Sequence, residues 1–118
     1  MLNILHVIPR LAGGGAEKLV LESCIEMQKR KDIKVLLLIF DNTIDMYPYL
    51  SKQVKIVVCD ISFTLFPFSI SKSDNKNFKK IITEFEPNII HTHLFEAEIK
   101  VRSELISGVT YVSHLHDN

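Results

Sequence analysis

Five short apolar runs rich in branched side chains alternate along this chain with segments of helical spacing. Such runs are typical of strands that are buried on both faces of a sheet. The strands are predicted over residues 2–9, 34–40, 54–59, 88–93 and 109–116. The helices are predicted over residues 16–31, 74–86 and 95–107, where apolar side chains recur every three or four positions. This alternation indicates an α/β domain with a parallel sheet.

Right-handed crossovers limit the order in which these strands can be arranged. They favour a doubly wound, Rossmann-like sheet of order 3-2-1-4-5 in three layers, with helices on both faces. Residues 1–118 then form one domain. Its topological switch point lies between the first and fourth strands. Ligands of such sheets bind there, beyond the carboxyl ends of the strands.

Composition excludes several classes of protein. The 14 basic and 14 acidic residues give a net charge of zero, whereas a nucleic-acid binder carries a basic footprint. The apolar runs are far shorter than the roughly 20 residues of a membrane span. Cys24 and Cys59 fall within predicted elements rather than in a disulfide framework, and no secretory leader is recognisable. We therefore expect a cytoplasmic protein that binds no nucleic acid.

The first predicted strand runs through three consecutive glycines, Gly13, Gly14 and Gly15, directly into a helix. Glycines let the backbone approach a ligand closely, and a helix start offers N–H groups and the positive end of the helix dipole. This combination predicts a site for a diphosphate, and a tight turn without a ligand is the alternative. A P-loop signature is absent, and the dinucleotide pattern GxGxxG fails at Lys18. Asp41 after the second strand keeps a nicotinamide or flavin domain as an alternative.

Two His-x-His pairs end neighbouring strands of the predicted sheet. His91 and His93 close the fourth strand, and His114 and His116 close the fifth. Strand period places both members of a pair on one face. Imidazole is a common metal ligand, and Asp117 adjoins the second pair. No acidic ligand belongs firmly to the set, however, and we expect no bound metal.

The histidines are expected to differ in role according to their position along each strand. We expect His91 and His114 to be hydrogen-bonded within the sheet and its flanking helices, and the mid-strand His6 to be structural. His93 and His116 end their strands, where the sheet opens into the cleft. We expect both of these to contact a ligand.

The connection after the third predicted strand is rich in aromatic residues. It carries Phe63, Phe66, Phe68 and Ile70. We expect these side chains to cover one face of the sheet. An apolar surface for an acceptor, or for peripheral contact with the inner face of a membrane, is the alternative.

Three motifs follow one another along the chain and together span essentially all of it. They are ILHVIPRLAGGGAEKLVLE from Ile4 to Glu22, EPNIIHTHLF from Glu86 to Phe95, and VSHLHD from Val112 to Asp117. In this order and spacing they resemble the N-terminal domain of the retaining GT-B glycosyltransferases of the family 4-like group (group 1 glycosyl transferases). The resemblance implies half of a transferase that moves a sugar from a nucleotide-diphosphate sugar to a saccharide or lipid-linked acceptor in the synthesis of cell-surface polysaccharides.

The resemblance also implies roles for individual residues. The implied site consists of Gly13, Gly14 and Gly15 at the donor diphosphate, His116 as the catalytic residue at the transferred sugar, and His93, Glu96 and Asp117 on the acceptor side of the cleft. The reaction would retain the anomeric configuration without a metal or other cofactor. Backbone N–H groups and cationic residues would stabilise the leaving phosphate.

In that family, a second Rossmann-like domain binds most of the donor. These 118 residues hold no counterpart of it, and the first domain looks cut short. We therefore expect the isolated chain to be inactive and to need a C-terminal domain or a partner subunit. The alternatives are a non-catalytic subunit of a split transferase and a small nucleotide-binding Rossmann protein.

Overall fold

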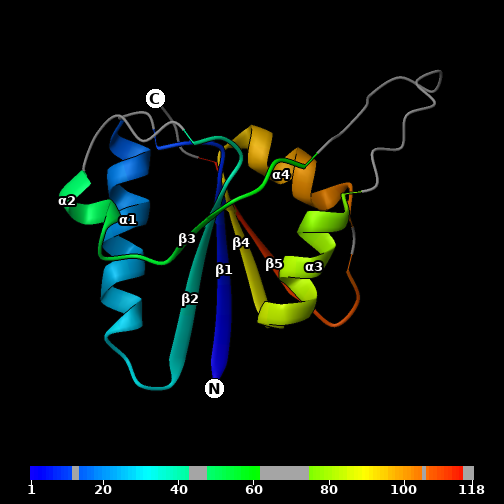
Figure 1. Ribbon diagram of the computed structural model, residues 1–118, viewed down its shortest axis with the longest axis horizontal. Coiled ribbons are helices and arrows are strands. Elements are labelled where there is room, and N and C mark those ends of the chain that lie inside the picture. The colour runs from blue at the N-terminus through cyan, green and yellow to red at the C-terminus, as the bar shows by residue number, and fades with distance from the viewer. Residues whose placement is uncertain (12–13, 43–47, 62–74, 105, 116–118) are drawn as a thin grey trace.

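The computed structural model describes residues 1–11, 14–42, 48–61, 75–104 and 106–115 (Figure 1). Along these residues, five strands alternate with helices. In chain order the elements are β1 (Leu2–Ile8), α1 (Gly15–Gln28), β2 (Ile33–Ile39), α2 (Pro48–Ser51), β3 (Ile56–Val58), α3 (Lys76–Phe85), β4 (Ile89–His93), α4 (Phe95–Arg102) and β5 (Thr110–His114).

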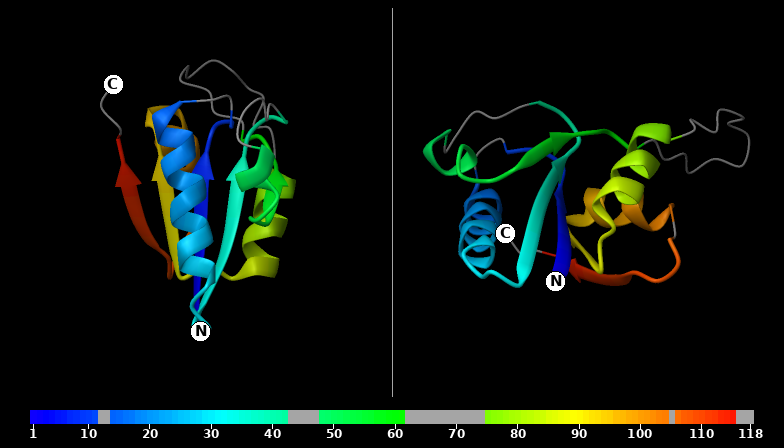
Figure 2. Two further views of the ribbon diagram at one scale, coloured as in Figure 1. Left: turned by 90° about the vertical axis from the view of Figure 1, so that its left-hand side faces the viewer. Right: turned by 60° about the horizontal axis from the view of Figure 1, so that its bottom comes forward.

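The strands form one parallel sheet of order β3-β2-β1-β4-β5, which confirms the predicted order. The central strand β1 pairs with β2 on one side and with β4 on the other, so that Ile4 is aligned with both Val35 and Ile89. Helices α1 and α2 cover one face, and α3 and α4 cover the other (Figures 1 and 2). The protein is therefore a doubly wound α/β fold of the Rossmann-like type.

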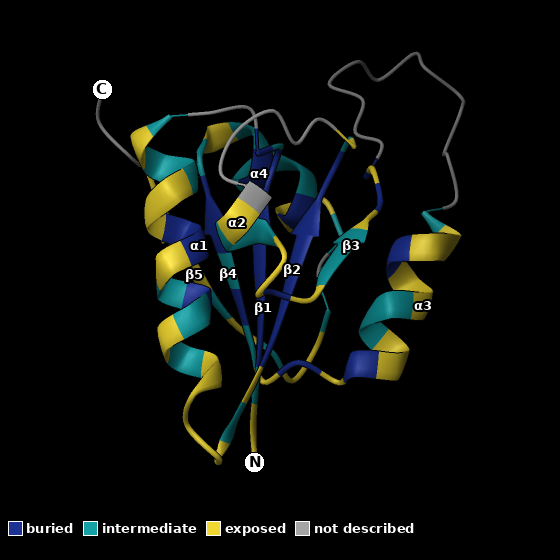
Figure 3. Ribbon diagram, turned by 60° about the vertical axis from the view of Figure 1, so that its left-hand side comes forward, coloured by how far each residue is buried: buried dark blue, intermediate teal, exposed yellow. Residues whose placement is uncertain are grey.

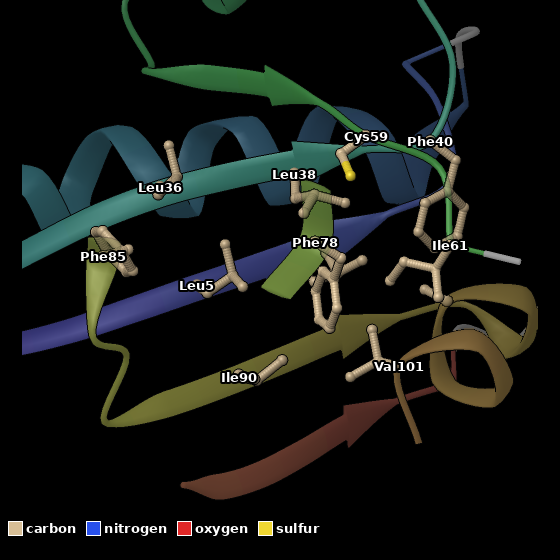
Figure 4. Packing of buried hydrophobic residues seen from close by; sticks show 12 residues of the cluster. Leu5, Leu36, Leu38, Phe40, Cys59, Ile61, Phe78, Phe85, Ile90 and Val101 are labelled. Carbon is tan, nitrogen blue, oxygen red and sulfur yellow. The ribbon is translucent and has the colours of Figure 1, made fainter. Parts of the chain in front are cut away.

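The face of the sheet under α3 and α4 holds an apolar core. Side chains alternate along a strand, so Leu5 and Val7 of β1 point to this face. Phe78 of α3 is fully buried between the strands and α4 (Figure 4). The buried members of this core are Leu5, Val7, Leu36, Leu38, Phe40, Cys59, Ile61, Phe78, Phe85, Ile90, Ala97 and Val101.

The face under α1 holds a second apolar core, centred on β1 and β2. Ile8, Leu37 and Ile39 pack there against α1. Cys24 of α1 is fully buried in the same core, and this burial raises the pKa of its thiol to about 12. Burial also raises the pKa of the Cys59 thiol, with the Asp60 charge as a smaller cause. Both cysteines are free, as expected of packing residues rather than a disulfide framework.

The helix after β4 is shorter than predicted. It ends at Arg102, and the turns that follow lead to Gly108, whose φ of +81° lies in the left-handed region that favours glycine. Beyond the helix, the backbone N–H of Ile106 donates to the hydroxyl of Tyr111, at 2.9 Å. Gly108 therefore shapes the turn before β5 rather than closing the helix.

Strand β5 lies at the edge of the sheet, where Figure 3 shows less burial than in β1 and β2. Val112 is 39% exposed there, on the face that α1 covers over the central strands. None of the helices in the described ranges is both long enough and apolar enough to cross a membrane. The aromatic connection with Phe63, Phe66, Phe68 and Ile70 lies outside the described residues.

Candidate functional site

The carboxyl ends of β1 and β4 mark the topological switch point. After β1 the chain turns to α1 on one face, and after β4 it turns to α4 on the other (Figure 2). Because the two connections diverge, the edge between them is open to a ligand. Gly14, Gly15, Arg10 and Glu96 all lie at this end of the sheet.

The glycine turn leads directly into α1. Gly14 is the N-cap, with φ −179° and ψ 168°, and the first bond of the helix runs from the N–H of Lys18 to the Gly14 carbonyl, at 3.3 Å. No side chain in the described part of the chain caps this end. The N–H groups of the first turn are therefore left to solvent or to a ligand, at the positive end of the helix dipole.

Backbone conformation does not explain why glycine occupies positions 14 and 15. Gly14 is extended and Gly15 is helical, and both conformations are open to any residue. A Cβ atom added to Gly15 would meet none of the described residues within 4 Å, and one added to Gly14 would collide with the end of the flexible Glu17 side chain. The fold alone therefore leaves room for a side chain at position 15.

Glu17 places a carboxylate beside Gly14 at the start of α1. An acidic group in the first turn complements the helix dipole. An anionic ligand at the same helix start would meet the charge of this carboxylate. Binding of a diphosphate there would therefore require Glu17 to turn away.

Charged side chains form a network of ion pairs across the carboxyl ends of three strands. One charged residue lies two positions beyond the end of each of these strands: Arg10 after β1, Asp41 after β2 and Asp60 after β3. The Nε of Arg10 donates to Asp41 at 2.9 Å, and its Nη2 lies 3.5 Å from Glu96. The Nζ of Lys100 lies 3.5 Å from Glu96 and 2.9 Å from Asp60. Glu96 thus links the pair Arg10–Asp41 to the pair Lys100–Asp60.

This network of ion pairs contains more acidic than basic side chains. Arg10 and Lys100 face the three carboxylates of Asp41, Asp60 and Glu96. The hydrogen bond that Arg10 donates to Asp41 is the main cause that raises the pKa of Arg10, and the charge of Glu96 adds to it. Both cations are already engaged by acids, so a phosphate would have to compete with carboxylates for them.

Leu94 carries backbone strain at the switch point. Its φ of 73° and ψ of 154° fall in a region that is populated almost only by glycine, at a cost of about 1–3 kcal/mol for other residues. The residue links β4 to α4, and its N–H donates to the carbonyl of His114 at 3.0 Å. Strain of this kind tends to collect at functional sites.

Histidines from three adjacent strands lie on one face of the sheet, beneath α1. The register aligns His6 with His91 and His93 with His114. His6 is 1% exposed, and its Nδ1 lies 3.0 Å from the Nε2 of His93, which is 4% exposed. The rings of His91 and His93 stack with their centroids 4.2 Å apart. Burial, and then the charge of His91, lowers the pKa of His6 to about 4, so its ring is neutral at pH 7.

A cavity of about 120 Å³ opens beside these rings. It lies between α1 and the strands, and part of its wall is apolar. The residues that line it are His6, Leu19, Val20, Ser23, Met27, His91, His93 and His114. The Sδ of Met27 lies 3.4 Å from the Nε2 of His6.

The structure places the predicted site residues in two groups. Gly14, Gly15 and Glu96 lie at the carboxyl edge, whereas His93 is buried beneath α1 and contacts His6. The contact of His93 with a ligand in the cleft stays a prediction. The predicted residues that lie outside the described part of the chain are Gly13, His116 and Asp117.

Sequence reasoning missed several residues of this region. Arg10 follows a proline directly at the end of a strand, and Lys100 stands four residues after Glu96, the spacing of an ion pair on a helix. Both signals were present in the sequence. The structural role predicted for His6 rests on its mid-strand position. Its alignment with His91 depends on pairing between strands far apart in the chain, which has no local signal in the sequence.

Comparison with known proteins gives no assignment. No protein-family model matches the chain, and no curated protein matches it significantly.

Proposed function

We propose that this chain is the acceptor-side domain of a retaining glycosyltransferase that uses a nucleotide-diphosphate sugar. The observation that carries the proposal is the turn at Gly14 and Gly15. It leads into an uncapped helix start at the switch point, and the described residues leave room for a Cβ atom at position 15. A bare backbone beside helix N–H groups suits the approach of a diphosphate. The three sequence motifs supply the transferase class.

The acceptor side of the proposed cleft is acidic. Glu96 lies at the start of α4 with Arg10 and Lys100 on either side. Carboxylates at this edge accept hydrogen bonds from sugar hydroxyls, and Arg10 is placed to exchange its acidic partners for an anionic group. His116 at the transferred sugar, Asp117 beside it, and peripheral contact with the inner face of a membrane remain parts of this proposal. So does the need for a donor-binding domain or partner subunit.

The two alternatives make different demands on the residues at this edge of the sheet. A small nucleotide-binding Rossmann protein would use Asp41 at the ribose, but Asp41 accepts a hydrogen bond from Arg10 at 2.9 Å. A non-catalytic subunit would need no open helix start. The uncapped turn favours nucleotide binding over a non-catalytic subunit, and the three sequence motifs favour the transferase over a small nucleotide-binding protein.

The test is to compare Gly15→Val with the unchanged protein in its complete natural form. We expect sugar transfer from a nucleotide-diphosphate sugar to fall about 100-fold, because a side chain would hold the diphosphate away from the helix start. The melting temperature should stay nearly constant, because a Cβ atom at position 15 meets none of the described residues within 4 Å. Gly14→Val should lose activity as well, with some loss of stability from its contact with Glu17.

Asn77→Val is the matched control, since it places valine in the exposed first turn of α3. It should leave turnover unchanged. Near-normal transfer by Gly15→Val would exclude an approach of the donor to this turn. Nucleotide binding by the protein without transfer to any saccharide or lipid-linked acceptor would favour the small nucleotide-binding protein instead. Transfer by the 118-residue chain alone would exclude the need for a second domain.

A further inference from the structure

The histidine group beneath α1 has the geometry of a ligand set. His6, His91 and His93 each offer one ring nitrogen, and these three atoms lie within 4.8 Å of one another. Zinc–nitrogen bonds of about 2.0–2.1 Å in a tetrahedral site place the nitrogens roughly 3.3 Å apart. The Nδ1 of His6 and the Nε2 of His93 already lie 3.0 Å apart. Bringing all three nitrogens onto one ion requires the rings to rotate, because the rings of His91 and His93 stack with their centroids 4.2 Å apart and their planes at 21°.

The scaffold beneath the three rings is rigid. His6 stands on β1, and His91 and His93 stand on β4, the two central neighbours of the sheet. The register aligns His6 directly with His91, and the two-residue period of the strand turns His93 to the same face. Sites built on strands hold their ligands more accurately than sites built on loops.

The surroundings allow an ion to enter and to complete its coordination. The cavity of about 120 Å³ beside the rings exceeds the roughly 30 Å³ that a water molecule occupies in the liquid. His114 lines the same cavity, and its ring centroid lies 5.8 Å from that of His93. On the other side, the Sδ of Met27 contacts the Nε2 of His6 at 3.4 Å, so that the Nδ1 of His6 faces the group.

The donor atoms select the class of ion. The described lining of the cavity contributes imidazoles and no carboxylate. Imidazole suits zinc, copper and nickel, whereas magnesium and calcium require oxygen ligands. Three protein ligands and one open position are also the arrangement of many zinc sites that bind water or a substrate.

We propose that His6, His91 and His93 form a binding site for a divalent transition-metal ion of the zinc type, with His114 or water at the fourth position. The ion would join β1 to β4 across the switch point. This site goes beyond the proposed transferase function and does not depend on it. It also departs from the expectation of no metal, which rested on the two His-x-His pairs and did not count His6 as a ligand.

The test is a zinc titration of the purified chain after treatment with a chelator. Calorimetry should show one equivalent bound, with a Kd of about 1 μM or below. Free zinc at 100 times the Kd should raise the melting temperature by about 10 °C, because an ion that binds only the folded state stabilises it. Magnesium at the same concentration should have no effect.

Variants then assign the ligands. His6→Gln and His91→Gln should each weaken zinc binding at least about 100-fold, whereas His114→Gln, outside the three-nitrogen set, should weaken it less than about 10-fold. Circular dichroism checks that each variant is folded. If a variant does not fold, the visible spectrum of the cobalt-loaded unchanged protein decides, because tetrahedral and octahedral cobalt(II) absorb differently.

Three outcomes would overturn the proposal. The first is zinc binding no tighter than millimolar, and the second is a His6→Gln variant that binds zinc as the unchanged protein does. The third is an octahedral cobalt spectrum typical of a solvated ion.

Discussion

On the α3–α4 face of the sheet, aliphatic and aromatic side chains from β1, β2 and α3 pack around the fully buried Phe78. On the α1 face, similar packing covers β1 and β2, but over β4 and β5 it gives way to histidines and a cavity. The first face holds buried apolar area that stabilises the fold by about 25 cal/mol per Å². The second face loses part of that stabilisation. The position of His6, which is only 1% exposed, could instead hold a close-packed aliphatic side chain.

The two faces differ in what their side chains contribute: one face mainly stabilises the fold, and the other carries imidazoles and a cavity. Buried imidazoles must keep their hydrogen bonds, and a cavity forgoes dispersion contacts with its lining. The α3–α4 face therefore carries stability, and the histidine side of the α1 face is where substitutions should alter binding more than folding.

The largest effect is expected for Phe78→Ala. Removing a fully buried aromatic ring from the α3–α4 core should lower the free energy of unfolding by about 3–5 kcal/mol, because the transfer free energy is lost and a void remains. Urea denaturation measures the change. Leu19→Ala is the comparison on the cavity side, where Leu19 is 48% exposed, and it should cost less than about 1 kcal/mol. Similar costs for the two variants would remove the distinction between the faces.

An intermediate effect is expected where the chain passes from β4 to α4, at Leu94. Leu94→Gly and Leu94→Ala lose the same packing against the α1-face core, but alanine retains the strained φ of 73°. The glycine variant should therefore be the more stable of the two by about 1–2 kcal/mol, after the greater chain entropy of glycine is allowed for. Thermal denaturation of both variants tests this order.

The control for that order is an exposed position inside a helix. At Lys80 of α3, glycine should be less stable than alanine by about 1 kcal/mol, which is the usual order. If Leu94 followed the usual order as well, strain would not be present at the end of β4.

The smallest effect concerns the bond between His6 and His93. His6→Leu or His93→Leu alone removes one partner of a buried hydrogen bond at 3.0 Å, and each should cost about 1–2 kcal/mol. The double variant should cost about 1 kcal/mol less than the sum, because both partners are then apolar. Urea denaturation in the presence of a chelator measures the four proteins of the cycle. Additive costs would mean that the two rings do not interact.

Much of the fold follows from the sequence, because local patterns report burial. Short branched runs predicted the five strands, and the right-handed crossover rule predicted their order. The spacing of Phe78, Ile81, Ile82 and Phe85 predicted α3. The short helix α2 was not predicted, since its four residues are too few to show a helical period. The end of α4 was placed too late: the helix ends at Arg102, and Gly108 shapes the turn before β5 instead of closing the helix.

The site was less predictable than the fold. Strand period correctly placed His91 and His93 on one face, but it could not show that His6 would lie beside them or that α1 would cover all three. Nor could it show that Arg10 would meet both Asp41 and Glu96, which come from different strands and helices. Such contacts depend on the register of β1 with β2 and with β4, for which no local sequence signal exists.

The pairing of β1 with β4 has a further consequence for how the protein reaches its native state. Asn3 ties the two strands together, since its backbone N–H donates to the Oδ1 of Asn88 at 2.7 Å across 85 residues of chain, and its side-chain amide donates to the carbonyl of Phe85 at 2.8 Å. Closing so long a loop carries an entropic cost before any contact repays it.

We therefore expect β1, α1, β2 and β3 to assemble locally, and α3, β4, α4 and β5 to assemble separately, before the two groups join. The rings of His6 and His91, 5.1 Å apart, face each other across that junction. Their contact forms only in the last step, so an intermediate can hold most of its native hydrogen bonds and still have no histidine pocket.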